Sequence, residues 1–188
     1  MKILRQTLDM IGERLQSGGK LDSLYPLYEA VDTLLYTPGH VTTGTTHVRD
    51  GLDLKRMMAT VVAALMPIVF FAMYNTGLQA HRAVVAGALP LDGWRTGVFT
   101  AMGGSFTTAF WDCFFHGALY FLPVIAVTFT AGGIVEVIFA CVRSHEVAEG
   151  FFVTGFLVPL ILPPTIPLWQ VAVGTASGVL LAKEVFGG

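Results

Sequence analysis

The sequence predicts an all-α membrane protein, a bundle of transmembrane helices in which one helix is broken by prolines. Of the 188 residues, 54% are hydrophobic and only 13% are charged, and three long runs are almost free of charge. A soluble domain carries about 25% charged residues, so the composition is typical of a membrane protein. The formal net charge of −2 leaves no excess of cations for a phosphate backbone, and no nucleic-acid partner is expected.

Residues 1–54 are predicted to form a cytoplasmic or interfacial segment with amphipathic helices. Charged side chains alternate there with apolar side chains at helical spacing, namely Leu4, Leu8, Ile11 and Leu15. Such a helix lies on a membrane surface or on a partner subunit. The polar stretch that follows contains His40 and His47, and two isolated histidines in a loop are weak candidates for metal ligands.

Residues 55–188 are predicted to be the transmembrane region. The first span covers about 57–78, within an uncharged run that exceeds the roughly 20 residues needed to cross a bilayer. The second covers about 118–142, and Glu136 is its only charged residue. The intervening residues are rich in Gly, Thr and aromatic side chains, which predicts a loop with an interfacial piece around 98–115.

The third uncharged run, 151–182, is too long for one straight span and contains four prolines: Pro159, Pro163, Pro164 and Pro167. Proline removes a helical hydrogen bond and breaks a helix interior. We therefore expect a half-helix, re-entrant or discontinuous, followed by a second helical piece. Such a break could present helix ends to an ion, although most proline breaks in membrane helices are purely structural.

The distribution of Lys and Arg predicts the orientation in the membrane. Seven of them precede the first span, two lie between the spans, and Arg143 follows the second. By the positive-inside rule the N-terminus of this multi-pass protein is expected to be cytoplasmic. Cys113 and Cys141 are then expected near opposite faces of the bilayer, where they cannot form a disulfide.

Glu136 is the residue that points most directly to function, because an ionisable group within a membrane helix is costly. Gly132 and Gly133 precede it by four and three residues, so the three share one helix face and leave a notch beside the carboxylate. A planar ring such as a quinone or a flavin fits such a notch. The alternative is helix packing through small residues, with Glu136 reaching Arg143.

Nine short segments, in this order, resemble those of one family of membrane proteins. They are Leu27-Tyr28-Glu29-Ala30, Tyr36-Thr37-Pro38-Gly39, His47-Val48-Arg49-Asp50, Asp53-Leu54-Lys55-Arg56, Met73-Tyr74-Asn75, Tyr120-Phe121-Leu122-Pro123, Glu149-Gly150-Phe151-Phe152-Val153-Thr154, Pro163-Pro164-Thr165-Ile166-Pro167-Leu168-Trp169-Gln170 and Lys183-Glu184-Val185-Phe186-Gly187-Gly188. On these segments the chain is similar to the N-terminal part of the B subunit of the sodium-translocating NADH:quinone oxidoreductase, a relative of the D subunit of the Rnf complex.

The resemblance implies a subunit of a six-subunit redox pump that passes electrons from NADH through flavins and iron–sulfur centres to ubiquinone while exporting sodium. It implies a fold of two inverted repeats, similar to urea transporters, of which this chain would be the first part. In the family a Gly-Gly-x-x-Glu motif is associated with quinone or inhibitor interaction. The motif falls here on Gly132, Gly133 and Glu136, and no catalytic residue or metal ligand is assigned.

The sequence departs from the family pattern at the flavin. Family members carry FMN on the threonine of a Ser-Gly-Ala-Thr motif, and riboflavin is a further expected cofactor. That motif is absent here, and Gly174-Thr175-Ala176-Ser177 does not match it. A chain that ends at Gly188 is therefore expected to be inactive by itself. The alternative functions are an Rnf-type electron-transport subunit and a passive channel or transporter.

Overall fold

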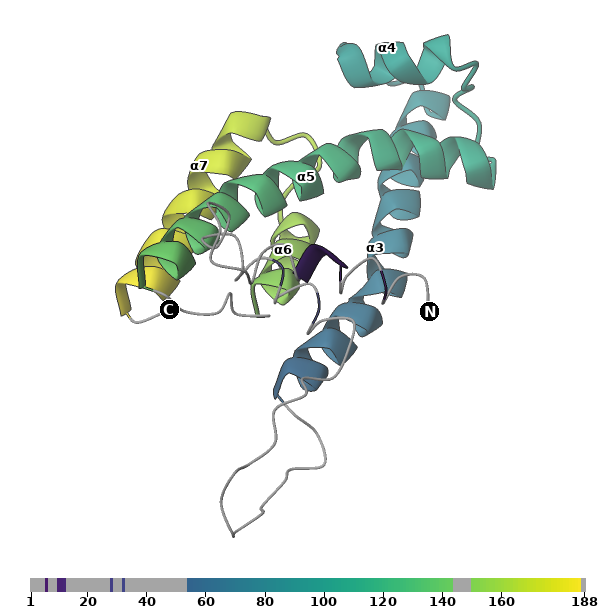
Figure 1. Cartoon of the computed structure of the whole chain (residues 1–188). Coiled ribbons are helices and arrows are strands. Elements are labelled where there is room, and N and C mark those ends of the chain that lie inside the picture. Colours follow the sequence, from purple (N-terminus) through teal and green to yellow (C-terminus); the bar gives the residue numbers. More distant parts are fainter. Residues whose placement is uncertain are drawn as a thin grey trace, which may run out of the picture.

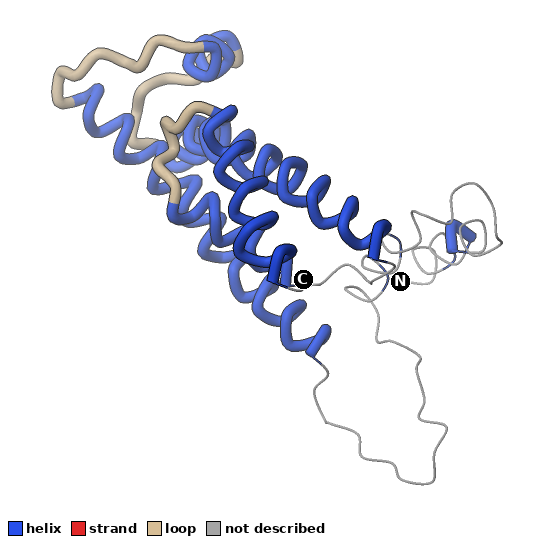
Figure 2. The backbone as a smooth tube through the Cα atoms, turned by 90° about the vertical axis from the view of Figure 1, so that its left-hand side faces the viewer, coloured by secondary structure: helices blue, strands red, loops and turns tan. Residues whose placement is uncertain are grey.

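A computed structural model describes residues 54–143 and 150–186 of the chain, together with Gln6, Met10–Gly12, Tyr28 and Asp32. These isolated N-terminal positions are helical, and the rest of the predicted amphipathic segment 1–54, with His40 and His47, lies outside the described residues. All regular structure in the described part is helical, without a strand (Figures 1 and 2). This agrees with the all-α prediction.

Helix α3 spans Leu54–Val85 and contains the predicted span 57–78, with additional turns at both ends. The additional turns carry charged residues such as Arg56 and Arg82, whose long side chains can reach the interface while their stems remain apolar. Pro67 lies within the helix. Gly87, with a φ of 100°, ends the helix. Its N–H donates to the carbonyl oxygen of Val84, and the N–H of Ala88 donates to the carbonyl oxygen of Ala83. This is the Schellman arrangement, which requires the left-handed conformation that glycine adopts readily.

The structure divides the predicted interfacial piece around 98–115 between two helices, and its interfacial position stays a prediction. Helix α4 spans Trp94–Ala101, and helix α5 begins at Phe110 and continues to Arg143. The division has a local cause near the start of α5. The carboxylate of Asp112 accepts hydrogen bonds from the hydroxyls of Ser105 (2.9 Å) and Thr107 (2.6 Å), and this pair of bonds holds the preceding loop against the first turn.

Helices α3 and α5 cross at a point where glycines bring the two backbones together (Figure 1). A Cβ atom at Gly77 would lie 1.8 Å from the carbonyl oxygen of Cys113, and one at Gly117 would lie 1.8 Å from that of Met73. Beside this crossing lies a buried apolar cluster, consisting of Val69, Met73, Ala118 and Phe121. Small residues allow membrane helices to approach closely in this way.

Helices α6 (Gly150–Ile161) and α7 (Leu168–Gly178) form a helical hairpin (Figure 1). The residues between them include three prolines, and α7 continues through a π-helical turn η2 (Val179–Lys183) and a 3₁₀ turn η3 (Glu184–Phe186). Both ends of the hairpin contact the C-terminal half of α5, whereas Pro164 and Thr165 at its turn lie near Thr76 of α3. Helix α6 therefore leads away from the C-terminal half of α5, and α7 leads back to it.

Two helices of the described part are long and apolar enough to cross a membrane: Arg56–Val85 and Phe110–Arg143. Their most apolar windows are only 17% and 28% buried, whereas the core helix of a soluble protein is mostly buried. The exposed surface of both helices is consistent with contact to lipid or to further membrane helices.

Candidate functional site

One face of α5 is directed toward the hairpin of α6 and α7. Thr128, Gly132, Glu136 and Ala140 recur at intervals of four residues, which places them on one side of a helix, and all four are buried. The predicted site residues therefore lie inside the bundle, and Glu136 is only 4% exposed. A carboxylate at such a position has left water and requires partners in the protein.

The notch at Gly132 exists, and a side chain of this chain occupies it. A Cβ atom at Gly132 would lie 2.7 Å from the ring of Phe151 and 3.1 Å from the methyl group of Thr175. At Gly133 the corresponding distance to the Phe151 ring is 3.6 Å, an ordinary van der Waals contact. The expected planar ring beside the glycines is thus a phenyl ring, contributed by the first turn of α6. Packing through small residues is observed, and the notch accommodates an aromatic ring.

Glu136 forms an ion pair with the ammonium group of Lys183. The two residues come from different elements, because Lys183 is the last residue of the π-helical turn η2 that follows α7. The Lys183 side chain is 29% exposed, so the pair joins a buried carboxylate to an ammonium group at the edge of the bundle. This contact orients one oxygen of Glu136 and holds the end of α7 against α5.

Arg143, the partner that the packing alternative assigned to Glu136, contacts Glu184 instead. Its guanidinium donates to the backbone carbonyl of Glu184 at 2.7 Å and lies 3.5 Å from the carboxylate of the same residue. Lys183 Nζ lies 3.9 Å from the Glu184 carboxylate. Two acidic and two basic residues therefore form one connected charge network where α5 ends and η3 begins.

Sequence reasoning missed Lys183 and Glu184 as parts of this site. A signal was present: Val171, Thr175 and Val179 are buried at intervals of four, and Lys183 continues that series. This series indicates a shared site with Glu136 only once the packing of α7 against α5 is known. The π-helical turn adds to the interest of the site, because such turns are often found at functional positions.

The site can exchange hydrogen bonds and protons with a polar group of a ring-shaped ligand. An ammonium group donates hydrogen bonds, while a carboxylate accepts them or, once protonated, donates one. The carboxylate lies one helical turn from the Gly132 notch, which holds the Phe151 ring, and the ammonium group contacts that carboxylate. These are the functions that binding and protonation of a carbonyl compound require.

The segment Gly174-Thr175-Ala176-Ser177 does not present an accessible threonine hydroxyl for covalent flavin. In the segment Gly174-Thr175-Ala176-Ser177, the Thr175 side chain is only 7% exposed and lies between α7 and Gly132. The Thr175 hydroxyl oxygen is itself buried and has no hydrogen-bond partner in the described part of the chain, so a phosphoester on it would require neighbouring side chains to move. No step through a flavin is therefore assigned to these residues.

Comparison of the sequence with known proteins identifies a family. Residues 41–188 match the model of the NQR2, RnfD, RnfE family. The chain is 53% identical over 98% of its length to the B subunit of the Na(+)-translocating NADH-quinone reductase of Stutzerimonas stutzeri, and equally similar to its namesake in Pseudomonas aeruginosa. It is 54% identical, again over 98% of its length, to that of Chromohalobacter salexigens.

The chain spans about half the length of these relatives, covering the N-terminal 47% of the first two and 45% of the third. The family model covers every helix from α3 to η3 and therefore includes the glycine notch and the charge network. With a family match over most of its residues and an all-helical bundle built around apolar spans, this chain belongs to the NQR2, RnfD, RnfE family.

Proposed function

We propose that this chain acts as part of the B-type membrane subunit of a sodium-translocating NADH:quinone reductase and contributes a quinone-binding site formed by Gly132, Gly133 and Glu136. The observation that carries the proposal is the buried Glu136 carboxylate beside an aromatic slot. The names of the similar relatives favour this assignment over an Rnf-type subunit or a passive channel. They also suggest the substrates, which are NADH, quinone and sodium for the whole complex.

In the proposed site the quinone ring takes the place of the Phe151 ring beside the two glycines, so the Phe151 side chain turns away when the quinone binds. One quinone oxygen accepts a hydrogen bond from Lys183, which turns from Glu136 toward the ligand. Reduction of the quinone to the hydroquinone takes two electrons, which the complex supplies, and two protons. The protonated carboxyl of Glu136 donates one proton to this oxygen, and the second proton reaches the other oxygen from water. This chain's residues thus bind and protonate, while other parts of the complex supply the electrons.

The remaining features of the proposal concern the complete protein. The α6–α7 hairpin is the proline-broken element of the first half of an inverted-repeat, urea-transporter-like fold. Residues 1–54 form the cytoplasmic or interfacial segment, and the N-terminus faces the cytoplasm of a bacterial inner membrane. Five further subunits, ubiquinone, sodium, covalent FMN and riboflavin complete the pump. These 188 residues alone are inactive in this proposal.

The decisive experiment measures quinone reduction in the complete complex carrying Glu136→Gln or Lys183→Met. The proposal predicts that kcat/KM for quinone falls by about 10- to 100-fold in Glu136→Gln, because a positioned acid or base is lost. Oxidation of NADH by a soluble artificial acceptor stays unchanged. Asp92→Asn is the matched control, since Asp92 is an exposed acidic residue remote from the site. Unchanged quinone kinetics in assembled Glu136→Gln complex would refute the role of this carboxylate.

A further inference from the structure

A pair of buried histidines lies at the opposite end of the bundle from Glu136. His81 of α3 is fully buried, and His116 of α5 is 5% exposed. Nε2 of His81 lies 3.0 Å from Nδ1 of His116, and Nδ1 of His81 lies 2.5 Å from the carbonyl oxygen of Thr107. The ring of Phe99 stacks on His116 with the centroids 4.7 Å apart. The proposed function leaves this pair without a role.

The hydrogen bonds determine which nitrogen of each ring carries the proton. The carbonyl of Thr107 can only accept, so Nδ1 of His81 is the donor. In a neutral ring Nε2 of His81 is then an acceptor, and Nδ1 of His116 donates to it. No carboxylate of the described residues lies within ion-pair distance of either ring. With both rings neutral, Nε2 of His116 is left as an acceptor.

That acceptor has no hydrogen-bond partner in the described part of the chain. Nε2 of His116 is buried and unpaired, although leaving a buried polar atom without a partner is energetically costly. Few such atoms occur in native proteins, and each calls for an explanation. A bound group that donates a hydrogen bond would provide one.

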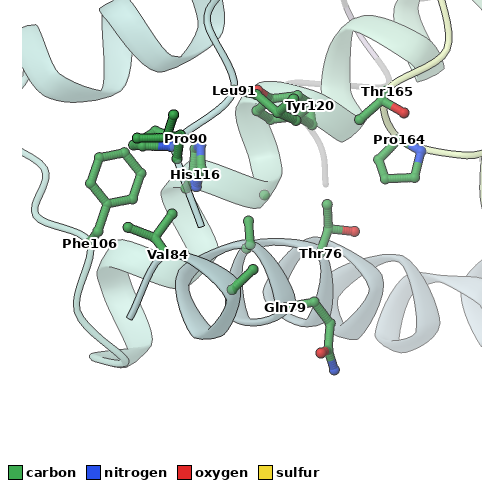
Figure 3. Close-up of a pocket in the computed structure, with 15 residues that line it drawn as sticks. Thr76, Gln79, Val84, Pro90, Leu91, Phe106, His116, Tyr120, Pro164 and Thr165 are labelled. Atoms are coloured by element: carbon green, nitrogen blue, oxygen red, sulfur yellow. The ribbon is translucent and has the colours of Figure 1, made fainter. Parts of the chain in front are cut away.

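His116 also forms part of the wall of an apolar cavity of about 270 Å³ between α3, α5 and the hairpin turn (Figure 3). Phe106 closes one end and Pro164 and Thr165 the other, while Leu91 and Tyr120 lie opposite α3. The Gln79 amide points away from the cavity, toward Asn75. His116 is the only polar side chain of this wall that is buried. The phenol of Tyr120 is already engaged with Thr96, at 3.3 Å.

We propose that this cavity binds a small apolar molecule with one hydroxyl group, of the size of a single-ring phenol, whose hydroxyl donates to Nε2 of His116. The volume supports one ring with small substituents, because a cavity of about 150 Å³ already admits benzene and drug-sized ligands need about 300 Å³ or more. The lining supports an apolar body. The proton positions support a donor rather than an acceptor, so a hydroxyl compound is preferred over a ketone or an ether.

The test uses the full chain in lipid nanodiscs, labelled with ¹⁵N in its histidine rings, and two probes of matched shape, 4-methylphenol and 1,4-dimethylbenzene. The phenol is expected to shift the His116 Nε2 resonance saturably and to bind at least tenfold more tightly than the hydrocarbon. A site with an unpaired acceptor rejects an analogue that lacks the donor. Equal affinity of both probes, or saturation without a change at His116, would show an unspecific apolar groove and overturn the proposal.

Two variants separate the hydrogen bond from the cavity. His116→Phe keeps an aromatic ring against Phe99 and is expected to abolish the preference for the phenol while both probes still bind. Ala83→Phe fills the cavity and is expected to abolish binding of both probes, with the resonances of the histidine pair otherwise retained. Gly174→Leu is the matched control, since Gly174 lines a separate groove between α6 and α7. Binding that persists in Ala83→Phe would place the probe elsewhere and refute the proposed site.

Discussion

Lys183 and Glu136 form an ion pair across the interface of α5 and α7, although 47 positions separate them in the sequence. The two side chains differ in exposure, since Glu136 is 4% and Lys183 is 29% exposed. A buried charge that loses its partner is strongly destabilising, whereas a partly exposed ammonium can turn toward solvent. Loss of the Lys183 ammonium group should therefore lower the free energy of unfolding more than loss of the Glu136 carboxylate.

This asymmetry yields the first prediction. Lys183→Met removes the ammonium partner of the buried Glu136 carboxylate and should lower the free energy of unfolding by about 3 kcal/mol, while Glu136→Met should cost less. The double variant should recover part of the loss, with a coupling free energy of about 1–3 kcal/mol. Unfolding in mixed micelles, followed by far-UV circular dichroism, provides these values. Strictly additive effects of the two substitutions would contradict the pairing.

The second prediction concerns the crossing of α3 and α5. Gly117→Ala would place a Cβ atom 1.8 Å from the carbonyl oxygen of Met73, so the helices must separate. We expect the free energy of unfolding to fall by about 2 kcal/mol or more, as for other overpacked sites. Gly174→Ala in α7 is the control, because nothing lies within 4 Å of a Cβ atom there. It should be neutral or stabilising by about 0.5–1 kcal/mol, since alanine favours helix. Similar stability of both variants would argue against the close crossing.

The third prediction distinguishes packing from ligand binding at the glycine notch. Gly132→Ala conflicts with the Phe151 ring, at 2.7 Å, and should destabilise the bundle, whereas Gly133→Ala meets only an ordinary contact at 3.6 Å. Adding Phe151→Leu should restore the stability of Gly132→Ala, because the smaller side chain makes room. Thermal denaturation of the purified chain measures both effects.

The same glycine variants test quinone binding in the complete complex. If a quinone uses the notch, Gly133→Ala should raise the KM for quinone without lowering the thermal stability. An unchanged KM in a stable Gly133→Ala complex would limit the notch to packing. The two readouts together therefore separate the structural role of the glycines from a role in binding.

The fourth prediction concerns the loop before α5. Asp112 holds Ser105 and Thr107, and the Thr107 carbonyl in turn contacts His81 and the thiol of Cys113. Asp112→Ala should loosen this loop and accelerate alkylation of the fully buried Cys113 by at least about tenfold, because the free energy of local opening decreases. Mass spectrometry after timed exposure to a maleimide gives the rate for each cysteine.

The contrast with two other positions makes this test specific. Asp92→Ala removes an exposed carboxylate from the same connection between α3 and α5, for which the structure gives no hydrogen bond to this loop, and should leave the rate at Cys113 unchanged. The rate at Cys141, near the other end of α5, should also stay the same in both variants. Equal acceleration at both cysteines would indicate general unfolding instead of a local effect.

The sequence by itself determined the features that depend on neighbouring residues. An uncharged run is a local property, and the free energy of placing its side chains in lipid hardly depends on the rest of the fold. For this reason the helices at 57–78 and 118–142 were predictable, although α5 begins eight residues earlier than expected. The carboxylate of Asp112 holds the loop before the first turn through the hydroxyls of Ser105 and Thr107, and hydropathy does not reveal such contacts. The helical face shared by Gly132, Gly133 and Glu136 was predictable for the same local reason.

Only the tertiary structure decided what meets these residues. Whether Glu136 pairs with Arg143 or Lys183 depends on how the hairpin of α6 and α7 returns along α5, and no local pattern encodes that path. The pairing of His81 with His116 likewise requires the close crossing of α3 and α5. Contacts between distant segments arise from the packing of whole helices, because many weak interactions must be satisfied at once. The sequence thus identified the helices and the glycine notch, and packing selected the partners within the site.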